Sequence, residues 1–191
     1  MYPSAALTPV GVIKLGGFME RVAIFIDGSN LYKGLVSALG AEYRLNFIKF
    51  IEALVAGRKL LRAYYYNAPL PTEDVASRAH QSFLNYLKRV PYVSVRLGRL
   101  ERRGETFVEK GVDIQIAVDM LRLAYARAYD VAVLVSGDGD FAEVVRVVQD
   151  MGMQVENATF HALSSYRLAQ QADRFYPLDE FPWDNLKSSG D

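Results

Sequence analysis

Aspartates that follow apolar runs are the residues of this chain best suited to chemistry. Asp27 comes directly after the apolar run 22–26, and Asp138 and Asp140 follow the apolar run 131–135. Asp113 stands at the beginning of a segment with helical spacing, residues 114–125. Carboxylates in one cleft repel one another, and a hard divalent cation such as Mg²⁺ or Mn²⁺ relieves that repulsion. Such an ion can lower the pKa of a water molecule and hold a phosphate oxygen, which predicts phosphodiester hydrolysis.

The elements around these acids are expected to alternate between strands and helices. Apolar runs predict strands at 22–26, 60–66, 93–100, 131–135, 153–156 (an edge strand) and 174–177, and helical spacing predicts helices at 31–39, 46–56, 73–90, 114–125, 141–151 and 164–172. This alternation predicts an α/β fold, a three-layer sandwich with a central, mainly parallel sheet. Residues 101–108 are expected to form a turn and a short hairpin arm. Ligands bind beyond the carboxyl ends of such strands, where Asp27 and Asp138 would face each other.

Helix capping is the alternative explanation for each acid taken singly. Aspartate is favoured at helix N-termini, so both explanations stay open for Asp27, Asp113 and Asp140. Capping explains Asp138 less well, because Asp140 is nearer to the helix that follows.

Polar and basic residues near the acids extend the predicted site to a substrate. Asn30 is a candidate to orient a substrate or a metal-bound water, or only to cap the first helix. Ser136 is a candidate to bond a phosphate or an acid, or simply to close its turn. Residues 88–110 hold seven basic and three acidic residues, and from them we assign Lys110, Arg99 and Arg103 to the substrate backbone, with solvated charge as the alternative. The tyrosines at 64–66 and 92 are candidates for stacking on bases, with core packing as the alternative. A single strand of nucleic acid is therefore a candidate partner.

Composition excludes several other kinds of site. The chain has no cysteine, which rules out disulfides, zinc thiolates and cysteine nucleophiles, and only two histidines, His80 and His161, so a metal site must be built from oxygen ligands. Lys plus Arg equals Asp plus Glu at 22 each, so nucleic-acid binding must come from a local patch. No Gly-x-Gly-x-x-Gly follows the first strand and no P-loop motif is present, so the phosphate cradles of dinucleotide and P-loop proteins are missing.

Length and patterning set the expected organisation. The 191 residues predict one domain at 19–178, with a flexible N-terminal arm at 1–18 and a C-terminal tail at 179–191. No apolar run approaches the ~20 residues of a membrane helix, and the absence of cysteine suits a reducing compartment, so we expect a cytoplasmic protein. The 12 tyrosines and 10 phenylalanines predict a homo-oligomer, because they are many for one core.

Three blocks of the sequence resemble the NYN domain family, in particular its LabA-like branch. They are residues 24–32 (IFIDGSNLY), 110–113 (KGVD) and 135–141 (VSGDGDF), in the family order, and the resemblance covers residues 20–178. It implies a PIN-like fold and a Mg²⁺- or Mn²⁺-dependent ribonuclease. Asp27, Asp113 and Asp138 match the family's acidic positions and Asp140 matches the fourth.

The resemblance also places Asn30 and Ser136 at polar positions that accompany the acids. Our leading hypothesis is a metal-dependent ribonuclease that acts on single-stranded RNA, in which Asp27, Asp113 and Asp138 ligate the ion and Asp140 completes the cluster. Some members of the family are known mainly as regulators. The alternatives are therefore an RNA- or protein-binding regulatory module with little catalysis, or a metal-dependent phosphatase or DNase.

Overall fold

Six parallel strands form the centre of the molecule. The computed structural model describes residues 19–69, 75–103 and 106–188, and at 75, 76, 102, 103 and 106–109 it describes the backbone alone. The strands lie in the order β3-β2-β1-β6-β7-β8. They are β3 (Val93–Leu97), β2 (Lys59–Asn67), β1 (Arg21–Asp27), β6 (Val131–Val135), β7 (Gln154–Thr159) and β8 (Arg174–Pro177). The predicted α/β class is confirmed.

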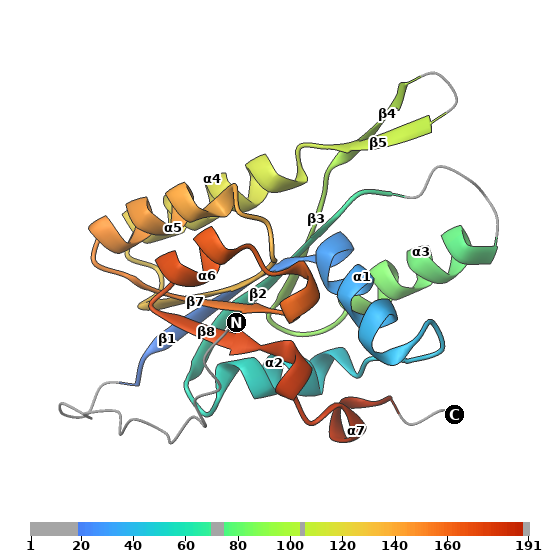
Figure 1. Cartoon of the computed structure of the whole chain (residues 1–191), viewed down its shortest axis with the longest axis horizontal. Coiled ribbons are helices and arrows are strands. Elements are labelled where there is room, and N and C mark those ends of the chain that lie inside the picture. Colours follow the sequence, from blue (N-terminus) through green and yellow to red (C-terminus); the bar gives the residue numbers. More distant parts are fainter. Residues whose placement is uncertain (1–18, 70–74, 104–105, 189–191) are drawn as a thin grey trace.

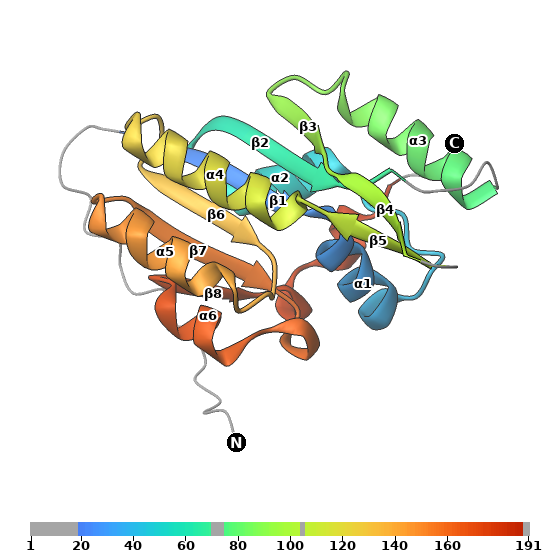
Figure 2. The same cartoon turned by 90° about the horizontal axis from the view of Figure 1, so that it is seen from above.

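Helices cover both faces of this sheet, as Figures 1 and 2 show. One layer contains α1 (Gly28–Leu39), α2 (Phe47–Val55), α3 (Val75–Leu87) and α7 (Trp183–Leu186). The other contains α4 (Val112–Tyr125), α5 (Phe141–Asp150) and α6 (Tyr166–Gln171). Side chains of β1 alternate between the two cores: Ile24 packs in the first and Phe25 in the second. A strand covered on both faces needs a continuous apolar run, which is what residues 22–26 provide.

The register of β1 and β6 places the two candidate turns next to each other. β1 and β6 are neighbours and parallel, and Ile26 lies opposite Val135. The residues that follow these positions are Asp27 and Ser136, so both turns leave the same edge of the sheet side by side. We call this the carboxyl edge.

An antiparallel hairpin extends from the sandwich on the same side as the start of α4 (Figure 1). Its strands are β4 (Arg99–Arg103) and β5 (Thr106–Lys110), and Arg99 pairs with Lys110 at its base. The hairpin was expected, but the strand predicted to run to residue 100 ends at Leu97. Gly98 separates β3 from β4, and a larger residue does not fit there because a Cβ would lie 2.7 Å from the Lys110 carbonyl oxygen.

Two further features of the C-terminal third bear on the predictions. The expected edge position of residues 153–156 is wrong, because β7 lies between β6 and β8 and pairs with both. Trp183, in the predicted tail, is buried and stacks on Phe160. The predicted arm at 1–18 lies outside the described residues. Within the described ranges, no helix is long and apolar enough to cross a membrane.

Candidate active site

Asp27 is buried at the end of β1 and is held by two donors. The backbone N–H of Asn30 donates to its Oδ1 at 3.0 Å, so Asp27 does cap α1. The Ser136 hydroxyl donates to its Oδ2 at 3.1 Å. Ser136 is fully buried at the end of β6. The carboxylate is thus fixed in one orientation by residues from two neighbouring strand ends.

The turn after β6 is anchored to the elements around it. The Asn30 side-chain oxygen accepts from the Gly137 N–H at 3.1 Å, which ties the turn to α1. The buried Asn157 amide, on β7, donates to the Ser136 carbonyl at 2.8 Å. Within the turn, the Asp140 N–H donates to Asp138 Oδ1 at 2.9 Å. These bonds hold the backbone that carries Asp138 and Asp140.

Both glycines of this turn pack closely against residues 163–165. A Cβ on Gly137 would lie 2.7 Å from the Leu163 carbonyl carbon and closer still to its oxygen. A Cβ on Gly139 would lie 2.5 Å from the Ser165 hydroxyl. The Ser165 N–H also donates to the Gly137 carbonyl at 2.9 Å. The start of α6 is therefore fastened directly to the acidic turn.

Asp113 reaches the same edge from the first turn of α4. Partial burial raises its pKa, and the carboxylates of Asp27, Asp138 and Asp140 raise it further. A carboxylate raises a neighbour's pKa only when it lies close enough to disfavour a second negative charge. The structure thus brings together, within electrostatic reach, acids from β1, α4 and the turn after β6.

The donor chemistry of this cluster fits a hard divalent cation, but its side chains are not closed around one position. Among the residues that the structure describes, no group of three His, Cys, Asp or Glu side chains is arranged to hold a metal ion. Asp27 is fixed, whereas Asp113 and Asp140 are exposed and Asp138 is half-buried.

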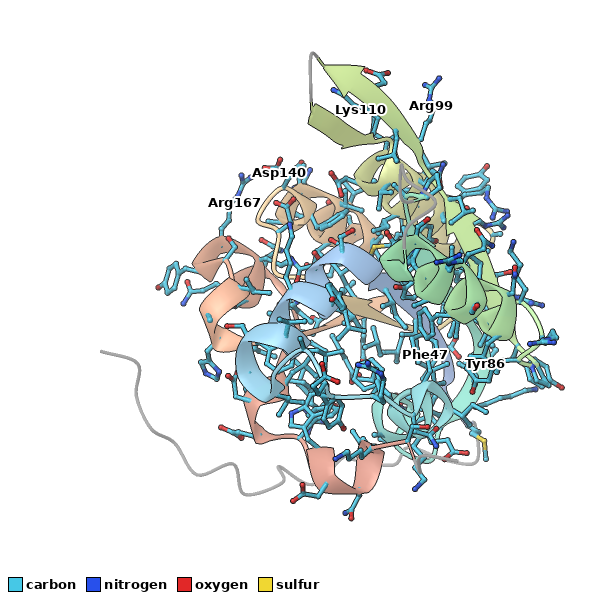
Figure 3. The ribbon with its side chains drawn as sticks, turned by 90° about the vertical axis from the view of Figure 1, so that its right-hand side faces the viewer. Phe47, Tyr86, Arg99, Lys110, Asp140 and Arg167 are labelled. Atoms are coloured by element: carbon cyan, nitrogen blue, oxygen red, sulfur yellow. The ribbon has the colours of Figure 1, made fainter. Side chains whose placement is uncertain are left out.

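The basic residues assigned from sequence lie on the hairpin. Arg99 is exposed at the beginning of β4, and Lys110 is half-buried at the end of β5. Figure 3 views the side of the molecule that carries both residues, with Asp140 on the same side. Arg103 is placed in β4, but its side chain lies outside the described part of the chain.

Several polar and aromatic residues have roles that the sequence did not reveal. Asn157 was missed because the segment 154–159 (QVENAT) is mostly polar, so no apolar run indicates that this asparagine is buried. The stacking role suggested for the tyrosines at 64–66 is wrong, because they are buried on β2 between the two layers. Tyr92 is exposed. Tyr125 and Ile114 on α4 are 84% and 70% exposed, so apolar area does remain outside the core, and the homo-oligomer stays a prediction.

The fold and this site define an α/β sandwich with an acidic carboxyl edge. The chain belongs to the NYN domain family, whose model matches residues 21–179. NYN domains are PIN-like nuclease domains, and membership supports a nuclease or RNA-related role. The resemblance seen in the sequence is thereby confirmed.

Two proteins of known sequence are similar to this chain. The LabA protein of Synechococcus elongatus ("low amplitude and bright") is 25% identical over 170 residues, which cover 84% of this chain and 85% of LabA. This similarity supports the LabA-like assignment. The uncharacterized protein y4oD of Sinorhizobium fredii is 36% identical over 84 residues, but the match spans only 38% of that protein and 42% of this chain.

A solved structure supports the fold. The crystal structure of a protein of unknown function from Vibrio parahaemolyticus has a TM-score of 0.65 and 24% sequence identity. The match covers 85% of this chain and 94% of the Vibrio chain. It supports the architecture and does not bear on activity.

Proposed function

We propose that this chain is a divalent-metal-dependent ribonuclease that hydrolyses phosphodiester bonds in single-stranded RNA. The observation that carries the proposal is the convergence of four acids: burial, together with Asp27, Asp138 and Asp140, raises the pKa of Asp113. Membership of the NYN family, whose domains are nuclease domains, supports the proposal independently of this electrostatic observation.

In this proposal Asp27, Asp113 and Asp138 hold Mg²⁺ or Mn²⁺, and Asp140 completes the cluster. Such an ion supplies neutralising charge, activates water and polarises a phosphate oxygen when bound. Ser136 acts through Asp27, because its hydroxyl fixes one carboxylate oxygen in place. Asn30 acts in the same way through the backbone of the acidic turn.

The hairpin supplies the substrate contacts in this proposal. Arg99 and Lys110 are paired in the register of the two strands, at the end of the hairpin nearest to α4. Together with Arg103 they are assigned to the phosphate backbone of the RNA, since cationic side chains offset the repulsion between phosphates and carboxylates.

A second candidate function is RNA binding without hydrolysis of the bound RNA. The observation favouring it is that the described carboxylates are not arranged around a single ion position. The same residues would then bind RNA beside an acidic cluster that fails to close.

The deciding experiment measures cleavage of labelled single-stranded RNA with Mn²⁺, with Mg²⁺ and with a chelator. We expect cleavage that needs the metal and falls by roughly 100-fold or more in Asp138→Asn, because one ligand and its charge are lost. The matched control is Asp150→Asn, since Asp150 lies at the far end of α5 and forms a surface pair with Arg146.

Each outcome assigns the chain to one candidate. Equal cleavage by wild type and Asp138→Asn would refute the catalytic assignment. Tight RNA binding without cleavage in any metal favours the binding module. Single-stranded DNA and a small phosphoester, tested in parallel, separate the ribonuclease from a DNase or a phosphatase.

A further inference from the structure

The carboxyl edge has a basic side chain on the flank opposite the hairpin. Arg167 lies on α6 and is exposed. In Figure 3, Asp140 lies between Arg167 on one side and Lys110 and Arg99 on the other. Among the described residues, no hydrogen bond or close ion pair involves the Arg167 guanidinium, which acts on Glu143 only through its charge.

Arg167 is held rigidly beside the acidic turn. Ser165 lies two residues before Arg167. Its backbone N–H donates to the Gly137 carbonyl, and Gly139 packs against the Ser165 side chain. The next residue, Leu168, is fully buried in the core below α5. The backbone at Arg167 therefore lies between two anchored residues, and the fold sets where it stands beside the acidic turn.

The position of Arg167 suits it to offset repulsion between RNA phosphates and the acidic cluster. A nucleic-acid strand that crosses four carboxylates is repelled unless cations lie along its path. The hairpin provides cations only on the α4 side of the cluster. Arg167 provides one on the α6 side, and the adjacent Tyr166, which is 64% exposed, offers a ring on which a base can stack.

We propose that Tyr166 and Arg167 form the second wall of the substrate path, so that a single RNA strand crosses the acidic cluster from Lys110 and Arg99 to α6. This inference rests on the proposed function for its substrate. It adds two RNA-contacting residues and a path for the strand across the site, between α4 and α6.

The test measures binding, so that it does not depend on catalysis. Fluorescence anisotropy of a labelled single-stranded RNA of about 16 nucleotides is followed with the Asp138→Asn protein, which prevents turnover. We expect Arg167→Ala to weaken binding roughly five- to ten-fold and to reduce the slope of log K against log salt by about 0.7, the value for one phosphate contact. Tyr166→Ala should weaken binding by roughly five-fold or more, with little change in that slope.

Two controls separate contact from general effects. Arg127→Ala removes an exposed arginine between α4 and β6, at the opposite edge of the sheet, and should leave the affinity within about two-fold of the parent. Arg167→Lys keeps the charge and should restore most of the affinity and the slope, which a purely structural role of the arginine would not predict.

The outcomes for this inference and for the proposed function are distinguishable. RNA binding that depends on Arg167, in a protein that never cleaves RNA, supports the inference and rejects the nuclease. Cleavage by wild type with unchanged binding in Arg167→Ala and Tyr166→Ala overturns the inference alone. Absence of RNA binding by the parent protein overturns it as well.

Discussion

Substitution of Gly137 by alanine tests whether the close packing of residues 163–165 is what holds the acidic turn. The new Cβ would lie 2.7 Å from the Leu163 carbonyl carbon, and an ordinary contact needs at least 3.4 Å. Residues 163–165 or the turn must therefore move. That movement weakens the hydrogen bonds of Gly137 to Ser165 and Asn30, at 2.9 Å and 3.1 Å.

The loss of stability in Gly137→Ala can be worked out from the overpacking and from the weakened hydrogen bonds. Overpacking costs about 1–3 kcal/mol, and a weakened hydrogen bond adds about 1 kcal/mol, which gives roughly 2–4 kcal/mol in the free energy of unfolding. For a domain of this size the Tm should fall by roughly 5–15 °C. Because Asp138 is the next residue, RNA cleavage should fall as well, by roughly 100-fold for a displacement of about 1 Å.

The assays are thermal unfolding followed by circular dichroism, and RNA cleavage at a temperature where both proteins are folded. Gly57→Ala is the control: its φ is +77° and nothing lies within 4 Å of the added Cβ, so it carries about 1–2 kcal/mol of backbone strain alone. It should lower Tm and leave cleavage unchanged. A Gly137→Ala protein that melts within about 2 °C of wild type and cleaves normally would refute the argument.

Two further predictions concern charges. Because the pKa of Asp113 is raised, its ionisation destabilises the folded protein as pH rises above the ordinary aspartate range, so metal-free Asp113→Asn should melt about 1–3 °C above wild type at pH 7. The difference in Tm between the two proteins should vanish below about pH 3, where the Asp113 carboxyl is protonated in both folded and unfolded chains. A higher Tm of Asp113→Asn that persists at that pH would contradict repulsion between the carboxylates as its cause. Arg58→Ala leaves the buried Glu156 without its 2.8 Å partner and should cost about 3–5 kcal/mol in urea unfolding. The half-exposed pair of Arg21 with Asp130 should cost only about 1 kcal/mol on Arg21→Ala, and equal losses in the two variants would contradict the role of burial.

The parts of the fold that follow from local pattern were predictable. Residues 22–26 and 131–135 are continuous apolar runs that end in acids, so their burial and the position of Asp27 and Asp138 follow from sequence. The helix predicted to begin at residue 46 begins at Phe47, and the Asn46 side chain caps it by accepting from the Lys49 N–H. These features depend on residues only a few positions apart.

The parts that depend on distant backbone contacts were not predictable. The contact of Leu163 with Gly137 joins main-chain atoms of segments 26 residues apart, and no side-chain pattern marks it. The tyrosines at 64–66 show why composition misleads. A run of tyrosines suits base stacking as well as a strand that is covered on both faces, and only the position of β2 within the sheet shows that these residues are buried. The hairpin strands were misplaced by a few residues because the break at Gly98, which packs closely against the Lys110 backbone, is not visible in the sequence.

The parallel arrangement of the sheet leaves its other edge free for engineering. All six strands begin there, and short turns at 56–58, 126–130 and 151–153 lead into β2, β6 and β7. At about 3.3 Å per residue, a strand of five residues keeps such a turn roughly 15 Å from the acids. Exposed turns tolerate insertions best. A fluorophore, an affinity handle or a tethering peptide inserted at one of these turns would leave the acidic carboxyl edge unobstructed, which makes immobilised or dye-labelled versions of the protein practical.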